Sequence, residues 1–335
     1  EISLGLVGSE MCIRDRMKGT WKLKARMVLT MIILFTIVYF LVVLAGSYLG
    51  IGGPSFYLIM SLCIVAAQYW FGPTLVKHSM NVRPLSESEA PNIHQMVEEL
   101  AREAGVPKPQ VELSEINVPN AFAYGRSKRS GHIAITRPIL GLLDRNELKA
   151  VLGHEMGHIK HNDMIVTAIV SLVPMICYYI ALSFMFSRSN ENNAGIIIGI
   201  LGYVFYLIGQ LLVLFISRTR EYYADEASVE YGNRPADLVS ALYKLSYGAA
   251  RCDDETIKDV NTVRAFFVND VDNAKRDLND FRQIDFDGDG SISEEELKEL
   301  SQRNVDVSTS NKIMELFSTH PDSLKRVKRL SELEN

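Results

Sequence analysis

Residues 148–163 read LKAVLGHEMGHIKHND, and this stretch decides how the fold is interpreted. It contains the pattern His154-Glu155-Met156-Gly157-His158. Residues i and i+4 of a helix lie on one face, so the two imidazoles can hold one metal ion. Glu155 can reach a water bound to that ion and act as its base. The alternative is a surface helix with two solvated histidines. In such a helix Gly153 and Gly157 would each cost about 1 kcal/mol without a packing reason.

A catalytic zinc takes three protein ligands and keeps one position for water. Residues 220–225, REYYAD, offer Glu221 as the third ligand, with Asp225 one helical turn further on. One carboxylate can bind the metal while the other accepts the ring N–H of a ligand histidine and fixes its tautomer. The alternative for Glu221 is a solvated acid at a helix end.

The composition limits the possible partners and compartments. The chain has 335 residues and a net charge of −5, too small to suggest a nucleic-acid partner. Its four cysteines show no CxxC spacing, which fits a reducing compartment. Residues 1–16, EISLGLVGSEMCIRDR, resemble translated adapter sequence, and we expect them to be a non-native segment that ends before Met17.

Four stretches are apolar and long enough to cross a bilayer, which takes about 20 residues. They are residues 27–49, 51–76, 164–186 and 194–217. For the second pair, a buried helical hairpin packed on the catalytic domain remains an alternative. Basic residues flank the outer ends of each pair, so the positive-inside rule places both termini and residues 77–163 in the cytoplasm.

Residues between the second and third stretches are typical of a soluble α+β segment. Residues 88–105 have helical spacing, and residues 111–116 and 132–136 indicate short strands. Asp144, with Glu147 three residues later, predicts a capping box at the start of the helix that carries His154 and His158.

Several of these stretches together resemble the HtpX group of the M48 family of membrane zinc metallopeptidases, which are gluzincins. The matching pieces, besides residues 148–163, are NAFAYG (120–125), HIAITRPIL (132–140), SRTREYYADEAS (217–228) and FSTHPDSLKRVKRL (317–330). The resemblance covers residues 17 to about 335. It implies a mostly helical α+β zincin-type metallopeptidase domain with four transmembrane helices.

The resemblance also implies roles for single residues. His154, His158 and Glu221 would bind one zinc ion, Glu155 would be the catalytic base, and Asp225 would orient His154. The implied activity is a zinc metalloendopeptidase in the cytoplasmic membrane that cleaves membrane or misfolded proteins on the cytoplasmic side. Its partners would be protein or peptide substrates and the lipid bilayer. Two other classes stay open: a membrane scaffold with an idle site, and a transporter, which the lack of ionisable residues in the spans disfavours.

Two further elements are expected at the catalytic cleft. His320 precedes Pro321 and is similar in position to the family's His-Pro motif, where it could stabilise an oxyanion. Its alternative role is a turn residue before a helix. We also expect a cleft rim formed by residues 132–136 and by Asn120, Ala121, Phe122 and Ala123. A peptide substrate could join such an edge as an added strand.

Residues 285–296, DFDGDGSISEEE, fit a twelve-residue EF-hand loop that binds one calcium ion. The ligands would be Asp285, Asp287, Asp289, Ser291 and Glu296. The alternative is an acidic loop without an ion. Members of the resembled family are short here, so residues 271–312 are interpreted as an insertion. We hypothesise that calcium orders this insertion and thereby positions His320.

These expectations divide the chain into seven segments. They are the non-native residues 1–16, a membrane hairpin 17–76, the first catalytic half 77–163, a second membrane hairpin 164–217, the second catalytic half 218–270, the insertion 271–312, and a C-terminal catalytic helix 313–335 with the His-Pro motif.

Overall fold

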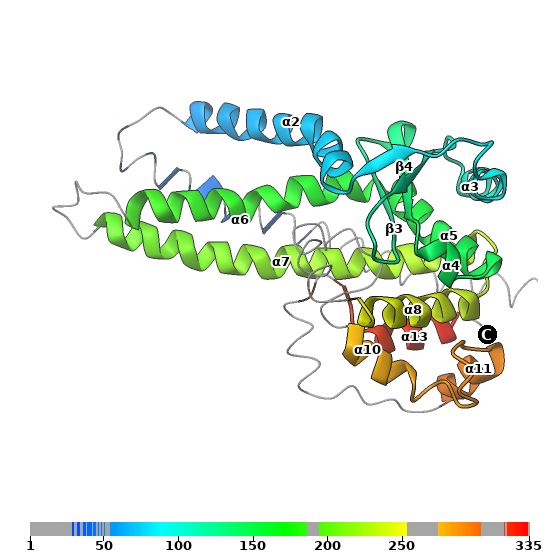
Figure 1. Cartoon of the computed structure of the whole chain (residues 1–335). Coiled ribbons are helices and arrows are strands. Elements are labelled where there is room, and N and C mark those ends of the chain that lie inside the picture. Colours follow the sequence, from blue (N-terminus) through cyan, green and yellow to red (C-terminus); the bar gives the residue numbers. More distant parts are fainter. Residues whose placement is uncertain are drawn as a thin grey trace, which may run out of the picture. The chain divides into compact units, whose positions relative to one another are not determined.

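The computed structural model describes residues 54–185, 194–252, 274–302 and 320–333, together with Ser318 and scattered positions between 29 and 50 (Figure 1). The expectations for residues 1–16, 253–273 and 303–317, and for about half of the positions in 27–49, lie outside these residues. The chain divides into two compact units. One contains Glu1–Leu62 and Val170–Thr219, and the other contains Cys63–Ile169 and Arg220–Asn335.

Close contact between two apolar helices characterises the first unit. Helix α6 spans Asp163–Met185 and helix α7 spans Ala194–Glu230. A Cβ atom at Gly199 of α7 would lie 2.7 Å from the Met185 side chain, and one at Gly202 would lie 3.1 Å from the backbone of Ala181. Both positions therefore favour glycine because it lets the two backbones approach, as small residues do between membrane helices.

One helix in the described part of the chain is long and apolar enough to cross a membrane. It is Gly195–Glu230, and its most apolar window is only 22% buried. The apolar part of α6, Val173–Met185, is shorter. Helix α2, Pro54–Ser79, covers most of the expected second span, but the structure does not describe all of its side chains.

A four-stranded sheet forms one side of the second unit. Its strands are β1 (Val82–Pro84), β2 (Gln110–Ser114), β3 (Ala121–Gly125) and β4 (Gly131–Thr136). The strand order is β1-β2-β4-β3, with β2 and β4 parallel and the other two pairs antiparallel. Of the two segments expected at the cleft rim, β3 lies at an edge, whereas β4 is paired on both sides.

Helices complete the second unit. They are α3 (Pro91–Ala104), the short η1 (Lys128–Ser130), α4 (Ile139–Leu142), α5 (Arg145–His161), α8 (Pro235–Ala250), α10 (Ala274–Phe281), α11 (Glu294–Gln302) and α13 (Ser323–Ser331). Apolar faces of α3, α5, α8 and α13 share one core with the inner sheet face. Figure 1 shows α13 beside α8, and the contacts between these two helices agree.

Helix α5 is fixed at its start by the expected capping box. The Asp144 side chain accepts hydrogen bonds from the backbone of Asn146 and Glu147, and Glu147 accepts one from the backbone of Asp144. The buried Glu147 also accepts bonds from Ser240 (2.7 Å) and Lys244 (2.6 Å) of α8. The helix that carries both motif histidines is therefore held by its own cap and by a neighbouring helix.

Candidate metal centre

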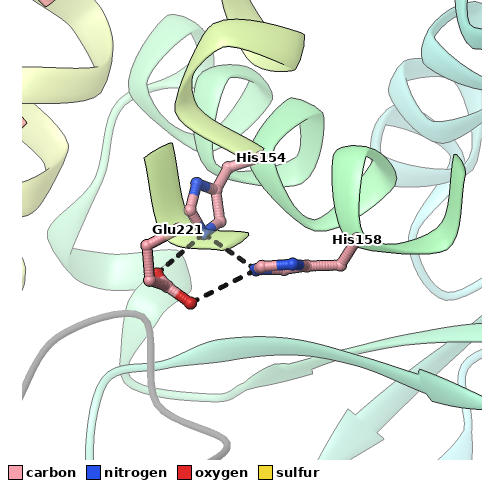
Figure 2. Close-up of side chains that lie close together, drawn as sticks. All are labelled: His154, His158 and Glu221. Atoms are coloured by element: carbon pink, nitrogen blue, oxygen red, sulfur yellow. Dashed lines mark hydrogen bonds and ion pairs between the residues drawn. The ribbon is translucent and has the colours of Figure 1, made fainter. Parts of the chain in front are cut away.

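Three side chains from two helices converge on one point (Figure 2). His154 and His158 project from α5, and Glu221 projects from α7. The two Nε2 atoms are 3.2 Å apart. The Glu221 carboxylate lies 3.5 Å from the Nε2 of His154 and 3.6 Å from that of His158. The structure thus brings together all three residues that the sequence predicted as metal ligands.

A carboxylate determines the tautomer of each imidazole. The Nδ1 of His154 is 2.9 Å from Asp225, and the Nδ1 of His158 is 2.7 Å from Asp163. Ionised carboxylates only accept hydrogen bonds, so each Nδ1 carries a proton and each Nε2 is the ring nitrogen left to bind a metal ion. The two Nε2 atoms and the Glu221 carboxylate therefore face one another, and together they form a donor set for a cation. Tetrahedral zinc, bound at about 2.0–2.1 Å, separates its ligand atoms by about 3.4 Å, so the observed spacings fit that ion.

Asp163 is a site residue that the sequence reasoning missed. It stands five residues after His158, a spacing that would place it away from His158 on one continuous helix. The left-handed conformation of Asn162, with φ +55°, ends α5 and returns Asp163 to the imidazole. Asp163 also lies 3.2 Å from the Nε of Arg220, the neighbour of Glu221. It therefore connects the histidine helix to the helix that supplies the carboxylate.

Asp225 occupies the position expected for it, and Arg326 neutralises it. Two guanidinium nitrogens of Arg326 donate to the Asp225 carboxylate, at 2.9 and 2.7 Å. Arg326 is 1% exposed, and its remaining terminal nitrogen is 3.9 Å from Glu221. The two short contacts of its guanidinium are therefore both made with the Asp225 carboxylate. This two-bond geometry is the strong form of an arginine–carboxylate pair.

The pKa of Glu155 is shifted in the opposite direction from the pKa values of Glu221 and Asp225. Burial raises the pKa of Glu155, and His158 and His154 only partly oppose that shift. Burial would also raise the pKa of Glu221, but His320 and His154 hold it well below its usual range. The pKa of Asp225 is lowered too, because Arg326 outweighs the effect of burial. Glu155 is thus the carboxyl group whose surroundings favour holding a proton.

Two glycines allow α5 and α7 to touch. A Cβ atom at Gly153 would lie 2.8 Å from the hydroxyl of Ser228. One at Gly157 would lie 2.9 Å from the Cβ of Ala227 and 3.0 Å from the Cα of Ala224. This close contact is the packing reason that the motif glycines required. It brings the α7 backbone near enough for Glu221 to face both histidines.

His320 also lies at the candidate metal centre. Its side chain is buried, and its Nδ1 is 3.4 Å from the Glu221 carboxylate. Neither ring nitrogen has a hydrogen-bond partner within the described part of the chain. The residue therefore has unused donor capacity next to the candidate ligands.

The expected substrate segment lies beside the catalytic helix. Strand β3 contacts α5, and the backbone N–H of Ala123 donates to Glu155. Asn120 differs from its neighbours, because its backbone N–H and C=O both bond to Thr136, at 2.8 and 2.9 Å. Asn120 is therefore committed to the sheet, whereas Ala121, Phe122 and Ala123 form the edge strand itself.

The expected calcium loop is a turn between α10 and α11. Carboxylate oxygens of Asp285, Asp287 and Asp289 lie within 4.8 Å of one another. Glu296 accepts hydrogen bonds from the loop backbone at Phe286 (2.7 Å) and Ser293 (2.8 Å). The backbone N–H of Ser291 donates to Asp289 at 2.7 Å. The three aspartates are thus gathered, and Glu296 closes the loop from α11.

Two histidines of one helix and a glutamate of a later helix define a metallopeptidase-type centre. Residues 87–334 match the model of Peptidase family M48. A protease HtpX homolog of Methanothermobacter thermautotrophicus is 55% identical over 230 residues, covering 69% of this chain and 88% of that protein. Protease HtpX homolog 2 of Methanosarcina mazei is 29% identical, covering 95% and 99% of the two chains.

Among solved structures, S. mikatae Ste24p matches with a TM-score of 0.44 and 18% identity, over 92% of this chain and 66% of its own length. The chain thus spans just under two thirds of that protein. The sequence matches are decisive: this chain belongs to Peptidase family M48 and is an HtpX-like protease of that family.

Proposed function

We propose that the chain is a membrane-bound, zinc-dependent endopeptidase whose metal is held by His154, His158 and Glu221. One observation carries this proposal. The two Nε2 atoms and one carboxylate face each other at 3.2–3.6 Å, while Asp225 and Asp163 lie within hydrogen-bond distance of the two Nδ1 atoms. In an M48 protease, a donor set of two histidines and one glutamate suits a bound zinc ion.

Bound zinc would lower the pKa of a water and polarise the scissile carbonyl. Glu155 follows the ligand His154 directly and has a raised pKa. It would take the proton of the attacking water and deliver it to the leaving amine. Its raised pKa suits both steps, since the group must hold a proton between them.

His320 is proposed as the donor that stabilises the oxyanion formed during attack. Its burial and its 3.4 Å distance from Glu221 support this role. The edge strand β3 is proposed to bind the substrate backbone. Its main chain reaches Glu155 through Ala123, so a peptide paired with β3 would run past the catalytic base. Main-chain pairing does not depend on the side chains of the substrate, so it would allow a broad specificity.

The proposed location is the cytoplasmic membrane, with several spans and the catalytic residues on the cytoplasmic side. The exposed apolar surface of α7 and its glycine contacts with α6 support membrane insertion. The proposed substrates are membrane or misfolded proteins. The proposed division follows the sequence: membrane hairpins at 17–76 and 164–217, and catalytic halves at 77–163 and 218–270.

A metal-exchange experiment tests the enzyme proposal. Purified protein is stripped with a chelator, assayed with casein, and assayed again after one equivalent of Zn²⁺. We expect loss and recovery of cleavage in the wild type and no recovery in His158→Ala. The exposed, non-site His161 supplies the matched control, His161→Ala, which should recover fully. Cleavage that survives complete metal removal would refute the proposal.

As a second function we propose that Asp285, Asp287, Asp289, Ser291 and Glu296 hold one Ca²⁺. The gathered aspartates and the Glu296 contacts support this assignment. Calcium titration by calorimetry tests it. We expect binding in the wild type and in Glu295→Gln, whose side chain is exposed, and loss of binding in Glu296→Gln. Equal calcium binding by Glu295→Gln and Glu296→Gln would contradict the proposed calcium site.

The proposed coupling of calcium to the catalytic site has a structural route. Asp277 of α10 accepts a 2.8 Å hydrogen bond from Ser323, the first residue of α13, in a buried setting. An ordered α10 would therefore help place α13 and the nearby His320. If calcium removal that leaves zinc bound does not alter casein cleavage, the coupling hypothesis fails.

A further inference from the structure

A basic loop joins the two strands next to the catalytic helix. Residues 125–131, GRSKRSG, connect β3 to β4 and carry Arg126, Lys128 and Arg129 without any acid. Arg129 is exposed, and the other two are half-buried. None of the three makes an ion pair with any residue that the structure describes. The loop therefore presents three positive charges that no acid within the described residues neutralises.

The loop conformation is fixed by its first residue. Gly125 has φ +147°, a backbone conformation that side chains disfavour. A Cβ atom there would also clash with the carbonyl oxygen of Ser130 across the loop. The basic residues consequently extend from a defined turn.

An exposed aromatic patch on α2 lies beside this loop. The guanidinium of Arg126 stacks over the Trp70 ring, 5.0 Å from its centroid. Trp70 is 61% exposed, and Phe71 and Leu75 are each 67% exposed. Such large apolar side chains are costly to leave in water. A cation stacked on an exposed tryptophan, next to further apolar groups, matches the mixed chemistry of a bilayer interface.

The sequence position of the patch agrees with this environment. The uncharged stretch 51–76 ends immediately before Lys77 and His78. Trp70 stands six residues before that end, about 9 Å along a helix axis. The interfacial layer outside the hydrocarbon core is about 5–8 Å thick on each side, so this depth places Trp70 at the inner boundary of the layer. Tryptophan and tyrosine concentrate in this layer, and Tyr69 precedes Trp70.

We propose that the 125–131 loop binds the anionic headgroups of the bilayer, with Trp70 and Phe71 seated in the interface below it. The inference rests on the proposed membrane location and extends it to the catalytic unit. Its consequence follows from β3. The same strand that enters the loop contacts Glu155 through Ala123, so headgroup binding would hold the substrate-binding edge against the catalytic helix.

Hydrogen exchange of the full chain in lipid nanodiscs tests the proposal. Two disc compositions are compared, phosphatidylcholine alone and phosphatidylcholine with phosphatidylglycerol. Each basic side chain at an anionic surface strengthens attachment about fivefold, so three should slow exchange in residues 125–131 by up to about 100-fold. We expect that protection in the phosphatidylglycerol discs at low salt, and its loss in 1 M salt.

Three variants separate charge from fold. Arg126→Gln/Lys128→Gln/Arg129→Gln should lose the lipid-dependent protection. Arg126→Lys/Arg129→Lys keeps the charge and should retain it. Arg102→Gln/Arg145→Gln/Arg282→Gln removes three exposed charges elsewhere and should also retain it. Exchange in α5 should be unchanged in all three, which shows that the fold is intact.

The opposite outcomes overturn the proposal. Loop exchange that is the same in both lipids, or protection that persists in the triple glutamine variant, would show that anionic headgroups do not bind there. Retention of the chain in the discs reports the membrane proposal, and casein cleavage reports the enzyme proposal. Either of these can fail or hold independently of the loop.

Discussion

The Nδ1 atom of His158 lies 2.7 Å from the carboxylate of Asp163, on the far side of a helix break at Asn162. This contact does for His158 what Asp225 does for His154. Both candidate ligand histidines therefore have their tautomer set by an acid that belongs neither to the HExxH pattern nor to the proposed ligand set. The two acids are themselves held by cations, Arg220 and Arg326.

Replacing Asp163 should weaken metal retention. Removal of such an outer-shell partner commonly costs about 10–100-fold in metal affinity. We expect that loss for Asp163→Ala and a smaller one for Asp163→Asn, which keeps an acceptor oxygen but loses the charge facing Arg220. Competition with a chromophoric zinc chelator measures it. Asp144→Ala, at the cap of the same helix, should lower stability by about 1 kcal/mol and leave metal affinity unchanged.

Arg326 should be the most sensitive charged residue for stability. Breaking a buried ion pair by removing one partner costs about 3–5 kcal/mol, because the other charge stays buried. Arg326→Leu should therefore destabilise strongly, whereas Asp225→Asn/Arg326→Leu should recover part of the loss. Chemical denaturation in detergent measures both. If the double variant shows no recovery, then Asp225 is not the buried charge that Arg326→Leu leaves without a partner.

Replacing a glycine of the motif by alanine should destabilise the protein, which is the opposite of what helix propensity alone predicts. Alanine normally stabilises a helix by about 1 kcal/mol over glycine. At Gly157 the new Cβ would press on the backbone of Ala224, which cannot rotate away, so Gly157→Ala should destabilise and move Glu221 from the histidines. Gly141→Ala is the matched control, because nothing lies within 4 Å of its Cβ position. Thermal unfolding and zinc affinity together check the pair.

The buried carboxyl group of Glu112 should make the stability of the protein depend on pH. Burial raises the pKa of this carboxyl, but His132, Tyr124 and Lys77 outweigh it and lower the pKa overall. A lowered folded-state pKa stabilises the fold above the unfolded value of about 4.3, and the contribution is lost as the pH falls through the folded value. Glu112→Gln should thus be less stable than wild type at pH 7 by about 1–3 kcal/mol. The difference should shrink below about pH 4, as followed by urea unfolding at several pH values. A constant difference would contradict the assignment.

Features that depend on short-range sequence patterns were predicted. The capping box at Asp144 and the shared face of His154 and His158 follow from helical spacing, whereas Glu221 was chosen as the third ligand from the REYYAD stretch and the family resemblance. Contacts made through a change of chain direction were not. Asp163 depends on the left-handed turn at Asn162, and the Arg326–Asp225 pair joins residues a hundred positions apart, so no local pattern reveals either. The contacts of Glu147 with Ser240 and Lys244 of α8 were missed for the same reason.

The central claim is that a metal on His154, His158 and Glu221 works with Glu155 as the base. Wild type and Glu155→Gln should be purified side by side, and metal content and casein cleavage measured on the same samples. We predict about one zinc per chain in both proteins, with cleavage reduced by about 10²–10⁴-fold in Glu155→Gln. Undiminished cleavage by Glu155→Gln, or an active wild type without zinc, would contradict the account.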